Sequence, residues 1–380
     1  MTANNCLQIN EQLKRLTKND RLLTNLFTNI NQAYLYFATG KMKLMKHFAH
    51  DKPFLLESGA TLPGIEISYY TYGTLNAEGS NVIWICHALT ANADPTDWWQ
   101  GFVGNDAVID PAKYFIVCAN ILGSCYGSSG PLNINPETQQ PYYHLFPSIT
   151  IRDMVNAHML LRTHLKIETI HLLIGGSMGG YQAIEWALME KDRIQQLFLL
   201  ATSPTESAWG IAVHTAQRLA IEADQSWKEN TANAGKKGLK AARAIGMLTY
   251  RNYGIMVKTQ SDTDAEKLDH YKAASYILHQ GNKLSDRFNA YSYWLLTKAL
   301  DTHHIARGRG GNTDTVLKSI GQRSLIIGIS SDILCPLIEQ QHMAAQMPNA
   351  TLIEIDSVYG HDGFLVETEK ISAQLKAWLK

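Results

Sequence analysis

The sequence predicts an α/β fold in which a mostly parallel sheet is interrupted by a block of helices. Four short apolar runs alternate with helix-patterned stretches, which is typical of parallel strand–helix–strand units; these runs are residues 82–86, 114–121, 170–176 and 197–203. From about residue 206 to residue 311 the strand rhythm stops and helical periodicity dominates. Two further apolar runs then follow, and they predict strands at 324–330 and 351–356.

This pattern predicts how the chain is divided. We expect an α/β core formed by residues 46–205 and 312–380, into which residues 206–311 are inserted as a helical cap. Residues 1–45 do not share the pattern and are expected to be a mobile N-terminal extension. With 380 residues, of which 45% are hydrophobic and 18% charged, the chain can form one large α/β domain plus an insertion.

Composition excludes several classes of function. The 34 basic and 34 acidic side chains balance, and no basic stripe suggests nucleic acid or a membrane surface as a partner. No run of 18 apolar residues predicts a membrane span. The five cysteines form no Cys-x-x-Cys pair, so we expect reduced thiols in a cytoplasmic protein. No spacing of ligand residues predicts a metal site, and no bound cofactor is expected.

The segment Gly-Gly-Ser-Met-Gly-Gly at residues 175–180 carries the most chemical information. An apolar run precedes it and a helix-patterned stretch follows, so the Gly-x-Ser-x-Gly pattern indicates the nucleophile elbow of an α/β-hydrolase core. Such a turn exposes the Ser177 hydroxyl at the carboxyl end of a strand, and glycines at 175 and 179 allow strand and helix to pass closely. The alternative interpretation is a glycine-rich turn that contains a serine with no catalytic role.

The same fold requires an acid after a later strand and a histidine near the C-terminus, in that order. Asp332 follows the predicted strand 324–330, and His361 follows the predicted strand 351–356. An imidazole can take and return the serine proton near neutral pH, and the carboxylate orients it. Taken singly, Asp332 could instead cap a helix before Pro336, and His361 could be one of 14 ordinary histidines.

An oxyanion hole needs two backbone N–H donors, one after the nucleophile and one in the loop after an earlier strand. We assign these donors to Met178 and to Leu89, which lies in the loop His87-Ala-Leu-Thr90. His87 and Thr90 either support this site or only cap the turn.

Several motifs together resemble the homoserine O-acetyltransferase family, over a region from about Phe54 to the C-terminus. They are His-Ala-Leu-Thr, Asn120-Ile-Leu-Gly-Ser-Cys-Tyr-Gly-Ser-Ser-Gly-Pro131, Ile149-Thr-Ile-Arg-Asp-Met154, Gly-Gly-Ser-Met-Gly-Gly and Tyr-Gly-His-Asp-Gly-Phe-Leu. The resemblance implies acetyl transfer from acetyl-CoA, a co-substrate, to the side-chain hydroxyl of L-homoserine in methionine biosynthesis. It also implies a cytoplasmic homodimer. By the same resemblance, Arg218 would hold the substrate carboxylate and Asp362 its ammonium group.

The chain departs from the family pattern at a few positions. Ser124 and Ser129 stand where glycine and threonine are usual, Asn289 and Tyr291 replace aspartate and asparagine, and the segment after Trp227 lacks a Gly-Asp-Tyr. These changes leave open succinyl-CoA as donor and serine as acceptor. A hydrolase of small esters could use the same triad, and a catalytically silent binding protein could share the fold.

Overall fold

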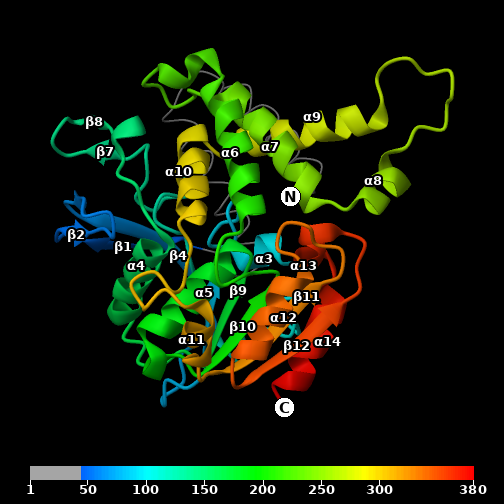
Figure 1. Ribbon diagram of the computed structural model, residues 1–380. Helices are drawn as coiled ribbons and strands as arrows, with labels where there is room; N and C mark the ends of the chain where they lie inside the picture. The colour runs from blue at the N-terminus through cyan, green and yellow to red at the C-terminus, as the bar shows by residue number, and fades with distance from the viewer. Residues whose placement is uncertain (1–43) are drawn as a thin grey trace, which may run out of the picture. The chain divides into compact units, whose positions relative to one another are not determined.

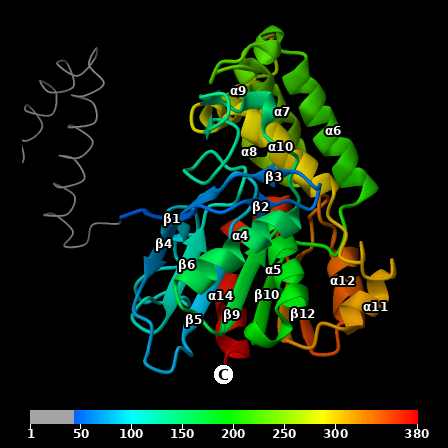
Figure 2. The ribbon, with the colours of Figure 1, turned by 90° about the vertical axis from the view of Figure 1, so that its left-hand side faces the viewer.

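The computed structural model describes residues 44–380 (Figure 1 and Figure 2). Except for its last two residues, the predicted N-terminal extension lies outside the described residues. No helix within 44–380 has the length and apolar character needed to cross a bilayer.

An eight-stranded sheet forms the centre of the fold, as the sequence predicted for its parallel part. In spatial order its strands are β1 (Lys46–His50), β4 (Ile65–Tyr72), β6 (Phe115–Ala119), β5 (Val82–Cys86), β9 (Leu172–Gly176), β10 (Gln196–Leu200), β11 (Arg323–Ile329) and β12 (Ala350–Ile355). The strands from β6 to β12 are parallel, while β4 pairs antiparallel with both β1 and β6. Two small hairpins stand apart, β2 (Phe54–Leu55) with β3 (Thr61–Leu62) and β7 (Ile134–Asn135) with β8 (Gln140–Pro141).

Successive residues of each central strand point to opposite faces of the sheet, and helices cover both faces. In β5, Trp84 packs in the core beneath α4 (Ile151–His164) and α5 (Met178–Met189), whereas Ile83 and Ile85 belong to the core on the other face, beneath α14 (Thr368–Trp378). Because both faces are covered, the central strands are almost continuously apolar, as in other parallel sheets.

The segment from 206 to 311 is helical in the structure. Its helices are α6 (Ala208–Glu222), the short 3-10 helix η3 (Gln225–Lys228), α7 (Lys236–Tyr250), α8 (Tyr253–Gln260), α9 (Lys272–Ser285) and α10 (Ala290–Asp301). Apart from an isolated bridge between Thr205 and His304, this part of the described chain makes no strand pairing. Figure 1 and Figure 2 both show α6, α7, α9 and α10 grouped together above the sheet.

Shorter helices complete the core. They are α3 (Pro95–Trp98), η1 (Tyr143–Leu145), η2 (Lys191–Arg193), α11 (Thr313–Lys318), α12 (Leu337–Gln346), η4 (Gly360–Asp362) and α13 (Gly363–Val366). The element η4 contains two of the predicted site residues.

Candidate active site

Ser177 occupies a strained turn between β9 and α5. Its backbone has φ 54° and ψ −128°, a region that costs a non-glycine residue about 1–3 kcal/mol. The surrounding structure holds it there: the Ser177 N–H donates to the Leu200 carbonyl at 2.9 Å, and the Thr202 hydroxyl donates to the Ser177 carbonyl at 2.9 Å. The sharp strand-to-helix turn that the sequence predicted is therefore present.

The glycines on either side of Ser177 are required by close backbone contacts. A Cβ atom on Gly179 would lie 2.0 Å from the Cys86 carbonyl oxygen, and one on Gly175 would lie 2.1 Å from the Gly179 carbonyl oxygen. Neither obstacle is a flexible side chain that could move aside. The close passage of strand and helix thus depends on the absence of side chains at 175 and 179.

The side chains of Ser177, His361 and Asp332 form a continuous hydrogen-bonded chain. His361 Nε2 lies 2.8 Å from Ser177 Oγ, and His361 Nδ1 lies 2.7 Å from Asp332 Oδ2. Since a carboxylate only accepts, Nδ1 carries the proton and Nε2 is left to accept from the serine hydroxyl. The three residues that the sequence placed after three different strands meet at one site.

The surroundings of this hydrogen-bonded chain raise the pKa of His361. The side chain of Asp332 is fully buried, and that of His361 is 5% exposed. Burial alone would lower the pKa of His361, but the charge and hydrogen bond of Asp332 outweigh it, and the pKa is raised. Asp332 is itself held by N–H donors from Leu334 at 2.8 Å and Cys335 at 3.0 Å. It does not cap α12, because Pro336 stands at that position.

The two predicted oxyanion donors are buried beside the elbow. Met178 is the first residue of α5, and Leu89 lies in the loop after β5. Among the described residues, neither N–H donates a hydrogen bond to another group. His87 anchors the loop: its Nε2 accepts from the Ile121 N–H at 3.3 Å, and burial lowers its pKa to about 4, so it stays neutral. His87 thus supports the loop through a structural contact.

Arg218 lies on α6 and is largely buried. Its Nη2 donates to Asp301 Oδ2 at 2.6 Å and to the Thr215 hydroxyl at 3.0 Å. Asp301 Oδ1 also accepts from His214 Nδ1 at 3.0 Å. Burial opposes ionisation of Asp301, but the bonds from His214 and Arg218 hold its pKa below the usual range. The second terminal nitrogen of Arg218, Nη1, is buried and has no partner among the described residues.

Asp362 follows His361 directly and carries an arginine partner that no sequence motif indicated. Its Oδ2 lies 3.1 Å from Arg251 Nε. Burial raises the pKa of Asp362, while the nearby charges of Arg251, Arg243 and His361 act in the opposite direction. The two predicted substrate-binding residues lie on separate elements, Arg218 on α6 and Asp362 in η4. Arg218 makes no direct contact with Asp362. It also makes none with the serine, histidine and aspartate of the hydrogen-bonded chain.

The end of α7 packs directly on the histidine loop. The Tyr250 ring lies 5.9 Å from the His361 ring. Gly360, with φ +65°, faces the same segment: a Cβ there would lie 2.9 Å from the Tyr250 carbonyl oxygen and 3.0 Å from the Arg251 carbonyl carbon. The helical segment and the core therefore meet at the site. No sequence motif distinguished Tyr250 or Arg251, because they lie inside a helix-patterned stretch.

Within residues 44–380, no cluster of three or more histidine, cysteine, aspartate or glutamate side chains is placed to hold a metal ion. The titratable groups at the site can move protons and stabilise charge. Together with an exposed-hydroxyl elbow, they provide what nucleophilic acyl transfer requires.

Comparison with known proteins agrees with this geometry. A sequence profile of the α/β hydrolase fold family matches residues 81–368. A homoserine O-acetyltransferase from Cyclobacterium marinum is 48% identical over 85% of this chain and 92% of its own length. The chain belongs to the homoserine O-acetyltransferase family. Another homoserine O-acetyltransferase, from Nostoc punctiforme, is 44% identical over 83% of the chain and 90% of its own length.

The fold of the family is also seen in solved structures. The crystal structure of the homoserine O-acetyltransferase from Bacillus anthracis superimposes with a TM-score of 0.83 at 24% identity, covering 90% of this chain and 98% of that one. At that identity the likeness concerns the fold. The family resemblance drawn from the sequence motifs is confirmed by the relatives above.

Proposed function

We propose that this protein transfers an acetyl group from acetyl-CoA to the side-chain hydroxyl of L-homoserine through an acyl-enzyme on Ser177. The hydrogen-bonded chain from Ser177 through His361 to Asp332 carries the proposal, because it supplies an activated nucleophile and a general base in one line. Membership of the homoserine O-acetyltransferase family supports the choice of substrates.

In the first half-reaction, His361 Nε2 takes the proton from Ser177 Oγ as this oxygen attacks the thioester carbonyl carbon. The carbonyl oxygen becomes an oxyanion, which the Leu89 and Met178 N–H groups are proposed to stabilise. When the C–S bond breaks, His361 gives its proton to the departing CoA sulfur. Asp332 stabilises the imidazolium throughout and does not itself need to be protonated.

In the second half-reaction, the homoserine hydroxyl takes the place of CoA. His361 removes the hydroxyl proton, the hydroxyl oxygen attacks the acetyl carbon, and the bond to Ser177 Oγ breaks. The proton then returns to Ser177, which restores the starting enzyme. The products are O-acetylhomoserine and free CoA, so the two steps together balance.

Acceptor recognition is assigned to Arg218 and Asp362. The free Nη1 of Arg218 supports the first assignment, since a buried, unpaired N–H group is stabilised by an arriving carboxylate. Asp301 holds the other terminal nitrogen and thereby fixes the plane of the guanidinium. For Asp362, burial raises the pKa, the neighbouring charges of Arg251, Arg243 and His361 oppose that rise, and an arriving ammonium group would further favour the carboxylate.

Exclusion of water is assigned to the inserted helices, residues 206–311. An acyl-enzyme is lost to hydrolysis unless water is kept away. The close packing of Tyr250 and Arg251 on Gly360 and the burial of His361 support this role.

A CoA-release assay tests the proposed function. The enzyme is given acetyl-CoA or succinyl-CoA, each with homoserine, with serine or without an acceptor. We expect fast CoA release only with acetyl-CoA and homoserine together. Fast release without an acceptor would instead indicate a hydrolase, and preference for succinyl-CoA or serine would replace the donor or the acceptor.

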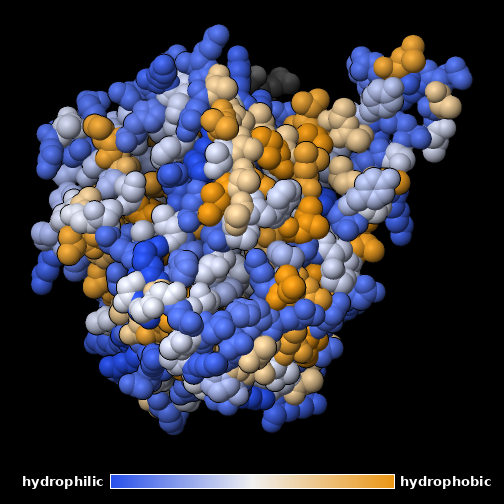
Figure 3. Space-filling view, in the orientation of Figure 1, coloured by the Kyte–Doolittle hydropathy of each residue, from blue (hydrophilic) through white to orange (hydrophobic). Residues whose placement is uncertain are grey.

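We also propose that the protein is a homodimer that pairs through its helical segment. Several large apolar side chains on α6 to α9 are exposed: Trp209, Leu219, Leu248, Tyr253, Val257 and Leu278. Figure 3 shows apolar residues gathered on the face that carries α6 and α7. Patches of this kind mark protein interfaces. Light scattering should give twice the chain mass, and Leu248→Glu should shift it toward the mass of one chain.

A cytoplasmic location completes the proposal. The four cysteines within the described residues, Cys86, Cys118, Cys125 and Cys335, are all unpaired, which suits a reducing compartment. Cell fractionation with an antibody to the protein tests it.

A further inference from the structure

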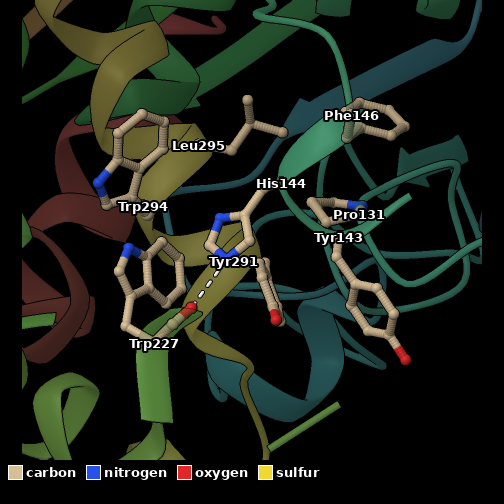
Figure 4. A pocket seen from close by; sticks show the side chains of 8 residues that line it. All are labelled: Pro131, Tyr143, His144, Phe146, Trp227, Tyr291, Trp294 and Leu295. Carbon is tan, nitrogen blue, oxygen red and sulfur yellow. Dashed lines mark hydrogen bonds between the residues drawn. The ribbon is translucent and has the colours of Figure 1, made fainter. Parts of the chain in front are cut away.

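An aromatic pocket is lined by residues of α10, η3, η1 and the loops beside η1, none of which belongs to the hydrogen-bonded chain of Ser177. We define it by Trp227, Trp294, Tyr291 and His144, whose rings gather on one side of the cavity in Figure 4. The cavity is small, with a volume of about 110 Å³. No step of the proposed reaction uses these residues.

The rings of the aromatic pocket support one another. The Trp227 ring centroid lies 5.0 Å from that of Tyr291 and 4.5 Å from that of His144, and Trp294 Nε1 donates to Glu222 Oε1 at 2.6 Å. His144 Nε2 lies 2.8 Å from the Trp227 carbonyl oxygen. Because a carbonyl only accepts, this nitrogen carries the proton and Nδ1 is left as an acceptor. The pocket therefore offers flat apolar surfaces and one acceptor, which suits a heterocycle that carries an amino group.

A second cavity adjoins this pocket and is basic. Its volume is about 310 Å³, and its lining includes Arg287, Lys236 and Asp286. Residues that are adjacent in the sequence line the two cavities. Pro131 and Tyr291 line the aromatic pocket, and their neighbours Leu132 and Ala290 line the basic cavity. A Cβ on Gly235 would lie 2.7 Å from the Trp227 ring and 2.9 Å from Ala290, which places the two walls in contact.

The charge of the basic cavity suits an anion. Lys236 pairs with Asp286 at 3.1 Å, but Arg287 has no carboxylate partner within residues 44–380. The exposed guanidinium of Arg287 therefore leaves a net positive charge at the cavity. Guanidinium groups match phosphate oxygens in geometry as well as in charge.

Arg287 also connects the basic cavity to the candidate active site. Its Nη1 donates to the Thr90 carbonyl oxygen at 2.6 Å, and it also bonds the Tyr126 hydroxyl. Thr90 directly follows Leu89, one of the two assigned oxyanion donors, so their Cα atoms are only about 3.8 Å apart. A long, flexible molecule bound at Arg287 thus has one end next to the loop where the thioester carbonyl must lie.

We propose that these two cavities bind the nucleotide end of the acyl-CoA donor, with its adenine in the aromatic pocket and its phosphates at Arg287 and Lys236. The pantetheine arm then runs past Thr90 toward Ser177. A purine carries the amino group and the flat face that the aromatic pocket suits, and CoA phosphates supply the anion. This inference rests on the proposed function, because that function makes a CoA thioester the donor.

The test compares acetyl-CoA with acetyl-pantetheine, which has the same thioester and arm but no nucleotide. Trp227→Leu should lower kcat/KM for acetyl-CoA by roughly 5- to 150-fold, the range for loss of one base–aromatic stack. The value for acetyl-pantetheine should stay within about twofold of wild type, because that donor never reaches the aromatic pocket. Equal losses with both donors, or no loss with either, would overturn the proposal.

Matched variants separate this effect from general damage. Tyr114→Leu removes a ring that also stacks on a histidine, His171 at 6.3 Å, but lines neither cavity, and it should leave the ratio of the two donors unchanged. If Trp227→Leu does not fold, Lys236→Gln serves as the second test. A severalfold loss of kcat/KM with acetyl-CoA, but not with acetyl-pantetheine, that becomes smaller at high salt supports the proposal. An unchanged ratio of kcat/KM for the two donors contradicts it.

Direct binding keeps this inference separate from the proposed function. Calorimetry with adenosine 3′,5′-bisphosphate should show binding to the wild type and weaker binding to Trp227→Leu. If homoserine is not acetylated from either donor, the proposed function fails while the calorimetric result still decides the nucleotide site. Absence of binding to the wild type would overturn the nucleotide site alone.

Discussion

Replacing Arg218 by lysine keeps a positive charge on α6 but removes the planar pair of donors that the arginine presents. In the structure one donor, Nη2, bonds Asp301 at 2.6 Å, and the other, Nη1, is buried and free. A lysine ammonium is a point charge and cannot hold Asp301 and a substrate carboxylate in one plane. The Arg218 side chain is only 8% exposed and that of Asp301 14%, so solvent does not screen the loss strongly.

Loss of one charged hydrogen bond of this kind costs about 1.5–3 kcal/mol. At 1.4 kcal/mol for each factor of ten, kcat/KM for homoserine should fall roughly 10- to 150-fold in Arg218→Lys. Acylation of Ser177 by acetyl-CoA alone should be nearly unchanged, since that step needs no acceptor.

The assay measures both rates in the same variant: rapid-quench acylation with acetyl-CoA, and steady-state transfer to homoserine. Arg162→Lys is the matched control, because Arg162 forms an ion pair of similar burial with Glu190 at 2.9 Å on elements away from the site. It should lower stability without changing the ratio of the two rates. Equal loss of acylation and transfer in Arg218→Lys would refute the assignment of Arg218 to the acceptor carboxylate.

Two further predictions concern the elbow and the histidine. Gly179→Ala should abolish acylation and destabilise the fold by several kcal/mol, because its Cβ would lie 2.0 Å from the Cys86 carbonyl oxygen. The control variant Gly79→Ala meets no atom within 4 Å and should cost only the strain of its positive φ. Thermal denaturation of the two variants compares the losses of stability. The acylation rate should rise with pH to a midpoint above the ordinary histidine pKa of about 6.5, because His361 must be neutral to act as a base and Asp332 raises its pKa. The stability that this shift contributes is present below the unfolded pKa and is lost as pH rises through the folded pKa; a rate profile with its midpoint below 6.5 would contradict this role of His361.

The strands and the serine, histidine and aspartate of the site could be predicted because they follow from local pattern and chain order. Each of Ser177, Asp332 and His361 lies in the segment that follows a short apolar run, and parallel strands bring their carboxyl ends to one edge of the sheet. The glycines at 175 and 179 could be predicted for the same reason, since the close passage is a property of the elbow itself.

Other features could not be predicted, because they depend on contacts between distant segments. The strands β1 and β4 were missed: β4 alternates only partly between apolar and polar residues, and its pairing with β1 and β6 is antiparallel. Arg251 and Tyr250 reach the histidine loop only through the packing of α7 on Gly360. Asp301 meets Arg218 across 83 residues of sequence, and no local pattern marks such a pair.

The acyl-enzyme is tested most directly by mass spectrometry of the protein mixed with acetyl-CoA in the absence of an acceptor. We expect a mass increase of one acetyl group that maps to the peptide containing Ser177, that disappears when homoserine is added, and that is absent in Ser177→Ala. Rapid transfer to homoserine with no acetylated Ser177 at any time in a single turnover would contradict the acyl-enzyme, because the acetyl group would then pass directly from CoA to the acceptor.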